Sequence, residues 1–134
     1  MEKYILENEV KVFGVVVETF PTGIEEAFRS LMKILNEEFN RSYYGITEMK
    51  ENRMIYKAVA EEKYNGEAEK YYLEKSVIEG GTYFTETIKD WRNNTDCIKD
   101  VFQKMMLSNQ VDKAKPCIEW YKNNDEMLCM MKAI

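Results

Sequence analysis

One acidic residue in an apolar segment is the strongest candidate for chemistry in this sequence. Residues 116–121 read Pro-Cys-Ile-Glu-Trp-Tyr, and Glu119 is the one charged residue among them. Side chains alternate along a β-strand, so Glu119 and Tyr121 should point one way and Ile118 and Trp120 the other. A buried carboxylate is costly unless a partner compensates for it. The segment therefore allows two interpretations: a solvated glutamate on an edge strand, or a cavity with one negative charge that suits a cationic or hydrogen-bonding small molecule.

Aromatic residues elsewhere in the chain could form the walls of such a cavity. Their flat faces stack on planar ligands and attract cations. The candidates are Tyr44, Tyr56, Tyr83, Phe84, Trp91 and Tyr121. Residues of these types also fill ordinary cores, as do methionines, including Met127, Met130 and Met131 in the predicted hairpin partner of the Glu119 segment. A soft aromatic pocket with one charge predicts recognition of many ligands of similar shape.

The absence of histidine excludes several kinds of site. A chain with no histidine lacks Ser-His and Cys-His nucleophile pairs and histidine ligands for zinc or haem. The chain has three cysteines, Cys97, Cys117 and Cys129, and they show no C-x-x-C spacing. An odd number of cysteines without this spacing is typical of reduced thiols in the cytosol. We expect no metal and no cofactor, and any proton transfer would use Glu, Asp, Tyr, Cys or Lys.

Length and charge disfavour further classes of function. The chain has 134 residues, 45% of them hydrophobic and 32% charged, which predicts a single globular domain over residues 1–134. A formal charge of -5 disfavours direct binding of nucleic acid. Neither a signal peptide nor an apolar run of about 20 residues is apparent. We therefore expect a soluble cytoplasmic protein with no membrane partner.

Hydrophobic patterns predict the elements that must position the candidate residues. A capping-box spacing at Thr22 and Glu25 predicts the start of one helix, and Asn94 or Thr95 could cap a second. The apolar stripes of these helices are Ile24, Ala27, Phe28, Leu31, Leu35 and Phe39, and then Ile98, Val101, Phe102, Met105 and Met106. Strands are expected at 9–20, 42–49, 54–60, 71–78, 82–88, 116–121 and 127–131. The polar residues 61–69 are expected to form a linker.

The order of these elements predicts an internal repeat. Strand, helix and two strands occur twice, over about residues 9–61 and 70–134. Two βαββ units would form an α+β domain, an antiparallel sheet with two helices packed on it. A groove between the halves would be a common place for a ligand. Thr47 takes the place of Glu119 in the first unit, so the predicted site has one acid.

Five segments also carry a family resemblance. They span residues 12–14, 43–46, 54–58, 78–83 and 116–121, and the last is the most specific. Together they resemble the GyrI-like small-molecule-binding domain, the effector-binding part of AraC- and MerR-type multidrug regulators, which shares a fold with SOUL haem-binding proteins. The resemblance implies a duplicated βαββ fold. It also implies that Glu119 is the acid of the ligand groove, with Tyr121 beside it among aromatic side chains.

The resemblance leaves three functions open. About eight residues precede the first expected strand, which leaves no room for a DNA-binding region and indicates a stand-alone binder of cationic or aromatic, drug-like compounds. Some stand-alone relatives are implied to hydrolyse strained-ring electrophiles, for which Glu119 would activate water and Tyr121 would steady the oxyanion, without a metal. Others inhibit DNA gyrase as protein partners. Binding ranks ahead of catalysis, because no other feature of the sequence supports an enzyme.

Overall fold

The computed structural model describes residues 1–36 and 40–134, so Phe39 of the expected helical stripe lies outside the described residues. The chain forms an α+β fold of eight strands, three α-helices and one short 3-10 helix, η1, within these residues. The elements are β1 (Glu2–Leu6), β2 (Val10–Val16), α1 (Ile24–Leu35), β3 (Tyr43–Lys50), β4 (Arg53–Glu61), α2 (Glu67–Lys70), β5 (Glu74–Ile78), β6 (Gly81–Lys89), η1 (Trp91–Asn93), α3 (Asp96–Met105), β7 (Cys117–Tyr121) and β8 (Glu126–Lys132).

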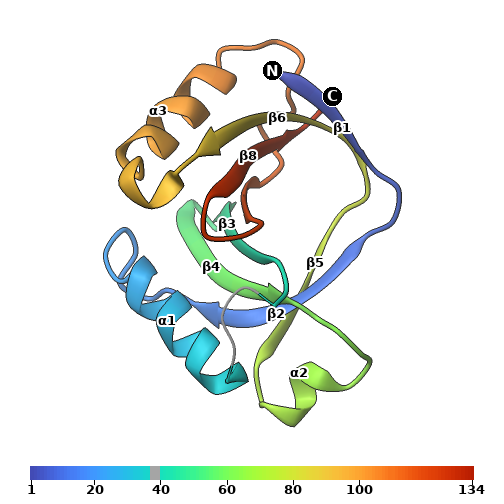
Figure 1. The fold of residues 1–134 in the computed structure, drawn as a ribbon. Helices are drawn as coiled ribbons and strands as arrows, with labels where there is room; N and C mark the ends of the chain where they lie inside the picture. The colour runs from blue at the N-terminus through green and yellow to red at the C-terminus, as the bar shows by residue number, and fades with distance from the viewer. Residues whose placement is uncertain (37–39) are drawn as a thin grey trace.

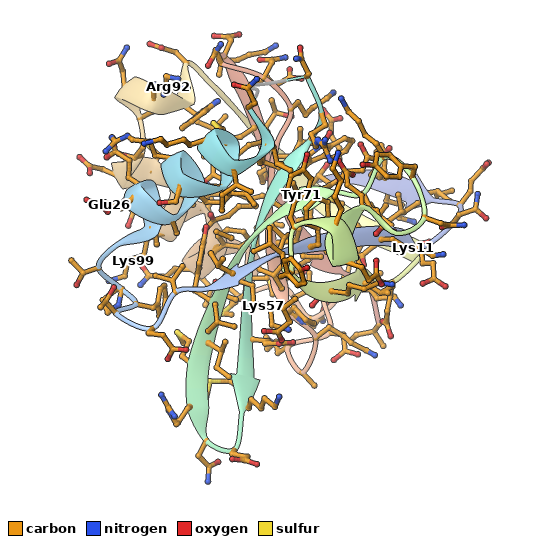
Figure 2. All side chains as sticks on the ribbon, turned by 90° about the horizontal axis from the view of Figure 1, so that it is seen from below. Lys11, Glu26, Lys57, Tyr71, Arg92 and Lys99 are labelled. Carbon is orange, nitrogen blue, oxygen red and sulfur yellow. The ribbon has the colours of Figure 1, made fainter. Side chains whose placement is uncertain are left out.

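All eight strands belong to one antiparallel sheet in the order β1-β6-β8-β7-β3-β4-β2-β5. The sheet curls into a half-barrel, and α1 and α3 lie against its outer face (Figure 1). The hairpin of β3 and β4 projects beyond the rest of the molecule (Figure 2). Its cross-strand pair Met49 and Met54 is accordingly exposed, at 64% and 58%.

Alternation along the strands divides the core into two parts. On the outer face, Phe13, Tyr43 and Tyr121 pack with Leu31 of α1 and Met105 of α3. The inner face carries a second cluster, which includes Val12, Tyr44, Tyr83, Ile118 and Met130. The predicted alternation along residues 118–121 is confirmed, because Ile118 belongs to the inner cluster and Tyr121 to the outer one.

The helical stripes are also part of the core. Leu31 and Leu35 are buried, and the other described residues of the first stripe pack against buried clusters. The expected capping box is wrong, however. Helix α1 begins after Gly23, whose φ of 92° suits glycine, and no side chain caps it. The Thr22 carbonyl instead accepts a hydrogen bond from the Thr19 hydroxyl. Met106 of the second stripe is 40% exposed because α3 ends at Met105.

The strands differ from expectation at the edges of the sheet. The sequence prediction missed β1, which pairs with β6, and it extended the first long strand to residue 20, whereas β2 ends at Val16. The expected linker contains the short helix α2. Strand β5, which the predicted division assigns to the second half, pairs with β2 of the first. The duplicated βαββ arrangement therefore stays a prediction within an established antiparallel α+β fold.

Across residues 1–36 and 40–134, every helix is too short or too polar to span a bilayer.

Candidate functional site

Glu119 lies in the middle of the sheet and faces the helices. Its strand, β7, runs between β3 and β8, where Gly45 and Cys129 are the residues directly opposite Glu119. Directly opposite residues share a face of the sheet. Tyr56 reaches the same face because it is opposite Thr47, two residues along β3 from Gly45. The pairing of β7 with β3 thus brings Tyr56 next to Glu119.

Two tyrosine hydroxyls bind one oxygen of the Glu119 carboxylate. Tyr56 Oη donates to Oε1 over 2.6 Å and Tyr121 Oη donates to the same atom over 2.8 Å. No described residue donates a hydrogen bond to Oε2, and no described lysine or arginine forms an ion pair with Glu119. The residue keeps part of its surface exposed. One carboxylate oxygen is therefore able to accept a further donor or to attract a cation.

Burial determines how this group titrates. It raises the pKa of Glu119 above the ordinary glutamate value, and the hydrogen bonds from Tyr56 and Tyr121 offset part of that increase. The pKa values of both tyrosines rise well above the usual value, first because of burial and then because of the charge on Glu119. Both hydroxyls consequently remain protonated donors at neutral pH, while the carboxylate lacks a compensating positive charge among the described residues.

Aromatic rings surround the three hydrogen-bonded groups. Phe20 stacks on Tyr56 at 5.3 Å between ring centroids. Phe28 of α1 meets Tyr121 edge to face at 5.5 Å, and Trp91 of η1 does so at 4.8 Å. Each of the three is partly buried. The carboxylate therefore lies among ring faces and edges, an environment that suits a flat or cationic organic group.

Gly45 leaves the space that the hydrogen bonds need. A Cβ atom at this position would overlap the Tyr56 hydroxyl and would lie 2.6 Å from Glu119 Oε1. Glycine in a strand interior often marks a close approach of other atoms to the backbone. This glycine lies in segment 43–46 of the family resemblance, but the sequence prediction gave it no role in the site.

The structure brings together four of the predicted site residues: Glu119, Tyr121, Tyr56 and Trp91. Phe84 belongs to the outer core, but Tyr44 and Tyr83 lie on the inner face, away from Glu119. Tyr44 is directly opposite Trp120 and therefore shares its face. Trp120 follows Glu119 in β7 and points to the other side of the sheet. Phe20, Phe28 and Gly45 contribute to the site but were not predicted to do so. Within residues 1–36 and 40–134, no three acids or cysteines lie together in an arrangement that could hold a metal ion.

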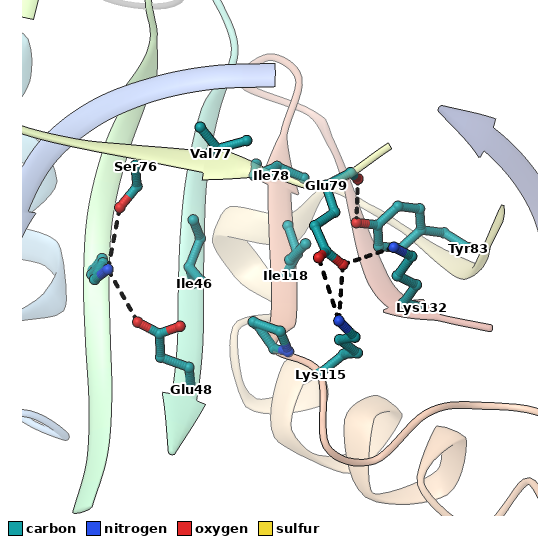
Figure 3. A pocket seen from close by; sticks show the side chains of 12 residues that line it. Ile46, Glu48, Ser76, Val77, Ile78, Glu79, Tyr83, Lys115, Ile118 and Lys132 are labelled. Carbon is teal, nitrogen blue, oxygen red and sulfur yellow. Dashed lines mark hydrogen bonds and ion pairs between the residues drawn. The ribbon is translucent and has the colours of Figure 1, made fainter. Parts of the chain in front are cut away.

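Two hollows lie on the inner face of the sheet, and Glu119 lines neither of them. The Glu119 carboxylate lies on the other, helix-covered face of the sheet, and its placement in a ligand groove between the halves stays a prediction. The smaller hollow has a volume of about 60 Å³, and its charged groups are paired, as Figure 3 shows. Lys132 and Lys115 bind Glu79 at 2.7 and 3.2 Å, and Lys57 binds Glu48 at 3.0 Å.

The raised pKa of Glu119 predicts a pH-dependent stability. A carboxyl group whose pKa is higher in the folded state stabilises the protein at low pH, and that contribution is lost as pH rises through the folded-state pKa. We expect the free energy of unfolding of the wild type, relative to Glu119→Gln, to fall as pH rises above the unfolded value of about 4.3. Urea unfolding at a series of pH values measures this difference. A difference that does not change with pH would contradict the shift.

Comparisons with known proteins show similarity of fold and not of sequence. No protein-family profile and no curated protein sequence matches the chain. A solved structure of a protein bound to tetraphenylphosphonium matches with a TM-score of 0.72 at 9% identity, over 100% of this chain and 94% of the other. A putative transcription regulation protein from Staphylococcus aureus matches with a TM-score of 0.66 at 9% identity, over 99% of each chain.

A hydrolase from Listeria innocua has a TM-score of 0.58 at 10% identity, over 99% of this chain and 91% of the other. At 9 to 10% identity, these three likenesses show a shared fold and leave the activity of this chain open. The protein is thus similar in fold, over essentially its whole length, to a small-molecule-bound protein, to a regulator-like protein and to a hydrolase.

Proposed function

We propose that this protein binds organic cations and aromatic, drug-like compounds, with the Glu119 carboxylate as the anchor. The observation that carries the proposal is the Glu119 carboxylate itself: it is bonded by two tyrosines whose rings contact other aromatic rings, and no described residue pairs a positive charge with it or donates to its second oxygen. A buried charge of this kind is destabilising in the free protein. A bound cation would relieve that cost, and the surrounding rings would add stacking and cation–π contacts.

The neighbour bound to tetraphenylphosphonium supports the choice of ligand class. In the same proposal, the fold is a GyrI-like one with two βαββ repeats, and recognition extends to several drug-like ligands of similar shape. Tyr56 and Tyr121 keep the carboxylate in place, while Phe20, Phe28 and Trp91 contact the ligand. Because neither hollow reaches Glu119, a ligand as bulky as tetraphenylphosphonium requires these rings to move apart.

Titration with tetraphenylphosphonium tests the proposal. We expect Glu119→Gln to weaken binding about 30-fold, because truncating one partner of a buried charge contact costs about 2 kcal/mol or more. Isothermal titration calorimetry at neutral pH measures both affinities. Glu74→Gln is the matched control, since it removes the same charge from an exposed position on β5. Equal affinity of the wild type and Glu119→Gln would rule out Glu119 as the anchor.

A further inference from the structure

The larger hollow on the inner face has features that the smaller hollow lacks. Its volume is about 150 Å³, and it lies among β1, β2, β3, β4, β5, β7 and β8. The residues that line it are Tyr4, Leu6, Val10, Ser42, Tyr44, Glu61, Ile78, Trp120 and Met130. Most are apolar or aromatic, and Glu61 is the one charged residue. A cavity of about this volume is large enough for benzene.

Three aromatic rings form one wall of this hollow. Tyr44 stacks on Trp120 at 6.1 Å between centroids, and Tyr4 meets the same indole edge to face at 5.5 Å. The indole Nε1 donates to Ser42 Oγ over 3.0 Å, which fixes its orientation. Lys122 Nζ lies 5.2 Å from the centroid of Trp120, so this ring already attracts one cation.

Glu61 supplies an uncompensated negative charge. Its backbone carbonyl accepts a hydrogen bond from Arg41, but its carboxylate forms no hydrogen bond or ion pair with a described residue. The charge acts inside the hollow: the pKa of Tyr44 is raised, mainly by burial and then by Glu61. In the smaller hollow, by contrast, Glu48 and Glu79 each have a lysine partner.

We propose that this larger hollow is a second binding site, separate from Glu119, for a small organic monocation of the quaternary ammonium type. The ammonium group would lie against the faces of Tyr4, Tyr44 and Trp120 with Glu61 as its counter-charge. The volume of about 150 Å³ limits the ligand to about the size of benzene. Tetraphenylphosphonium, with four phenyl rings, is excluded. The two faces of the sheet would then bind cations of different size.

Choline and its neutral analogue 3,3-dimethyl-1-butanol, which has carbon in place of the charged nitrogen, test this site. We expect choline to bind the wild type in a saturable manner by titration calorimetry, and Glu61→Gln to weaken it on the order of tenfold. The chain has two tryptophans, so Trp91→Phe leaves Trp120 as the one tryptophan whose emission reports on this hollow. Choline should change the emission of this variant, and the neutral analogue should not at the same concentrations.

Cross-controls separate this site from the one proposed at Glu119. Glu119→Gln should retain choline binding, and Glu61→Gln should retain tetraphenylphosphonium binding. Three results would each overturn the second site: absence of saturable choline binding to the wild type, equal binding of choline by the wild type and Glu61→Gln, or equal binding of the neutral analogue. If Glu119→Gln lost choline binding and Glu61→Gln kept it, choline would be assigned to the first site. If Trp91→Phe does not fold, calorimetry on the wild type and Glu61→Gln decides the question.

Discussion

Glu67→Ala is expected to lower the free energy of unfolding by about 3 kcal/mol. Arg41 donates to both carboxylate oxygens of Glu67 over 2.7 Å, and the two side chains are 4% and 3% exposed. Truncation removes the Glu67 charge from a guanidinium that is shielded from water, which is more costly than loss of the attraction alone. We expect the low end of the range for buried pairs, because Arg41 keeps its hydrogen bond to the Glu61 carbonyl. Urea unfolding followed by circular dichroism measures the change.

A neighbouring ion pair provides the control for this prediction. Glu69, two residues along α2, binds Lys75 over 2.9 Å, but both side chains are more than half exposed. Glu69→Ala should therefore leave the free energy of unfolding nearly unchanged, because solvent screens such pairs. Replacing both partners of the buried pair, as Arg41→Met with Glu67→Leu, should restore much of the loss. If Glu67→Ala and Glu69→Ala have the same small effect, the buried pair does not contribute as described.

Gly45→Ala is expected both to destabilise the fold, by about 1 to 3 kcal/mol, and to abolish binding at Glu119. The added methyl group would overlap the Tyr56 hydroxyl and lie 2.6 Å from Glu119 Oε1. Tyr56 is held by Phe20 at 5.3 Å and Phe28 at 6.5 Å, so it has little room to move. The hydrogen bond from Tyr56 to Glu119 must break. Thermal unfolding and tetraphenylphosphonium titration measure the two effects.

A double substitution separates this steric mechanism from a general weakening of β3. Tyr56→Phe removes the hydroxyl that the new methyl group would meet first. The double variant Gly45→Ala with Tyr56→Phe should therefore lose less unfolding free energy than the two single variants lose in sum. Such non-additivity is expected in a double-mutant cycle of residues in contact. Strict additivity would indicate that the cost of Gly45→Ala arises elsewhere in the strand.

Short-range sequence patterns were sufficient to predict most helices and strands and part of the site. Alternation along 118–121 places Glu119 and Tyr121 on one face whatever the fold, because the side-chain period of a strand is two. The stripe containing Leu31 and Leu35 likewise identifies the buried side of α1. Both predictions depend on residues within one element. They required no knowledge of what that element packs against.

The sequence prediction failed where several elements meet. Tyr44 and Tyr83 were grouped with Glu119, but pairing across strands places both on the inner face. Phe28 was assigned to the core without a role in the site, although α1 brings it to Tyr121. The position of each ring relative to the carboxylate depends on strand order and register, which periodicity does not encode.

By itself, the sequence determined that a single acid, Glu119, lies in an apolar strand beside Tyr121, within an antiparallel α+β fold. Only the tertiary structure decided which groups meet that acid. The pairing of β7 with β3 and of β3 with β4 brings the Tyr56 hydroxyl to Glu119 across 63 residues of sequence. It also places Trp120 with Tyr44 and Glu61 around a separate hollow. The physical reason is that a local pattern specifies which side chains share a face, whereas long-range strand pairing specifies which faces come together.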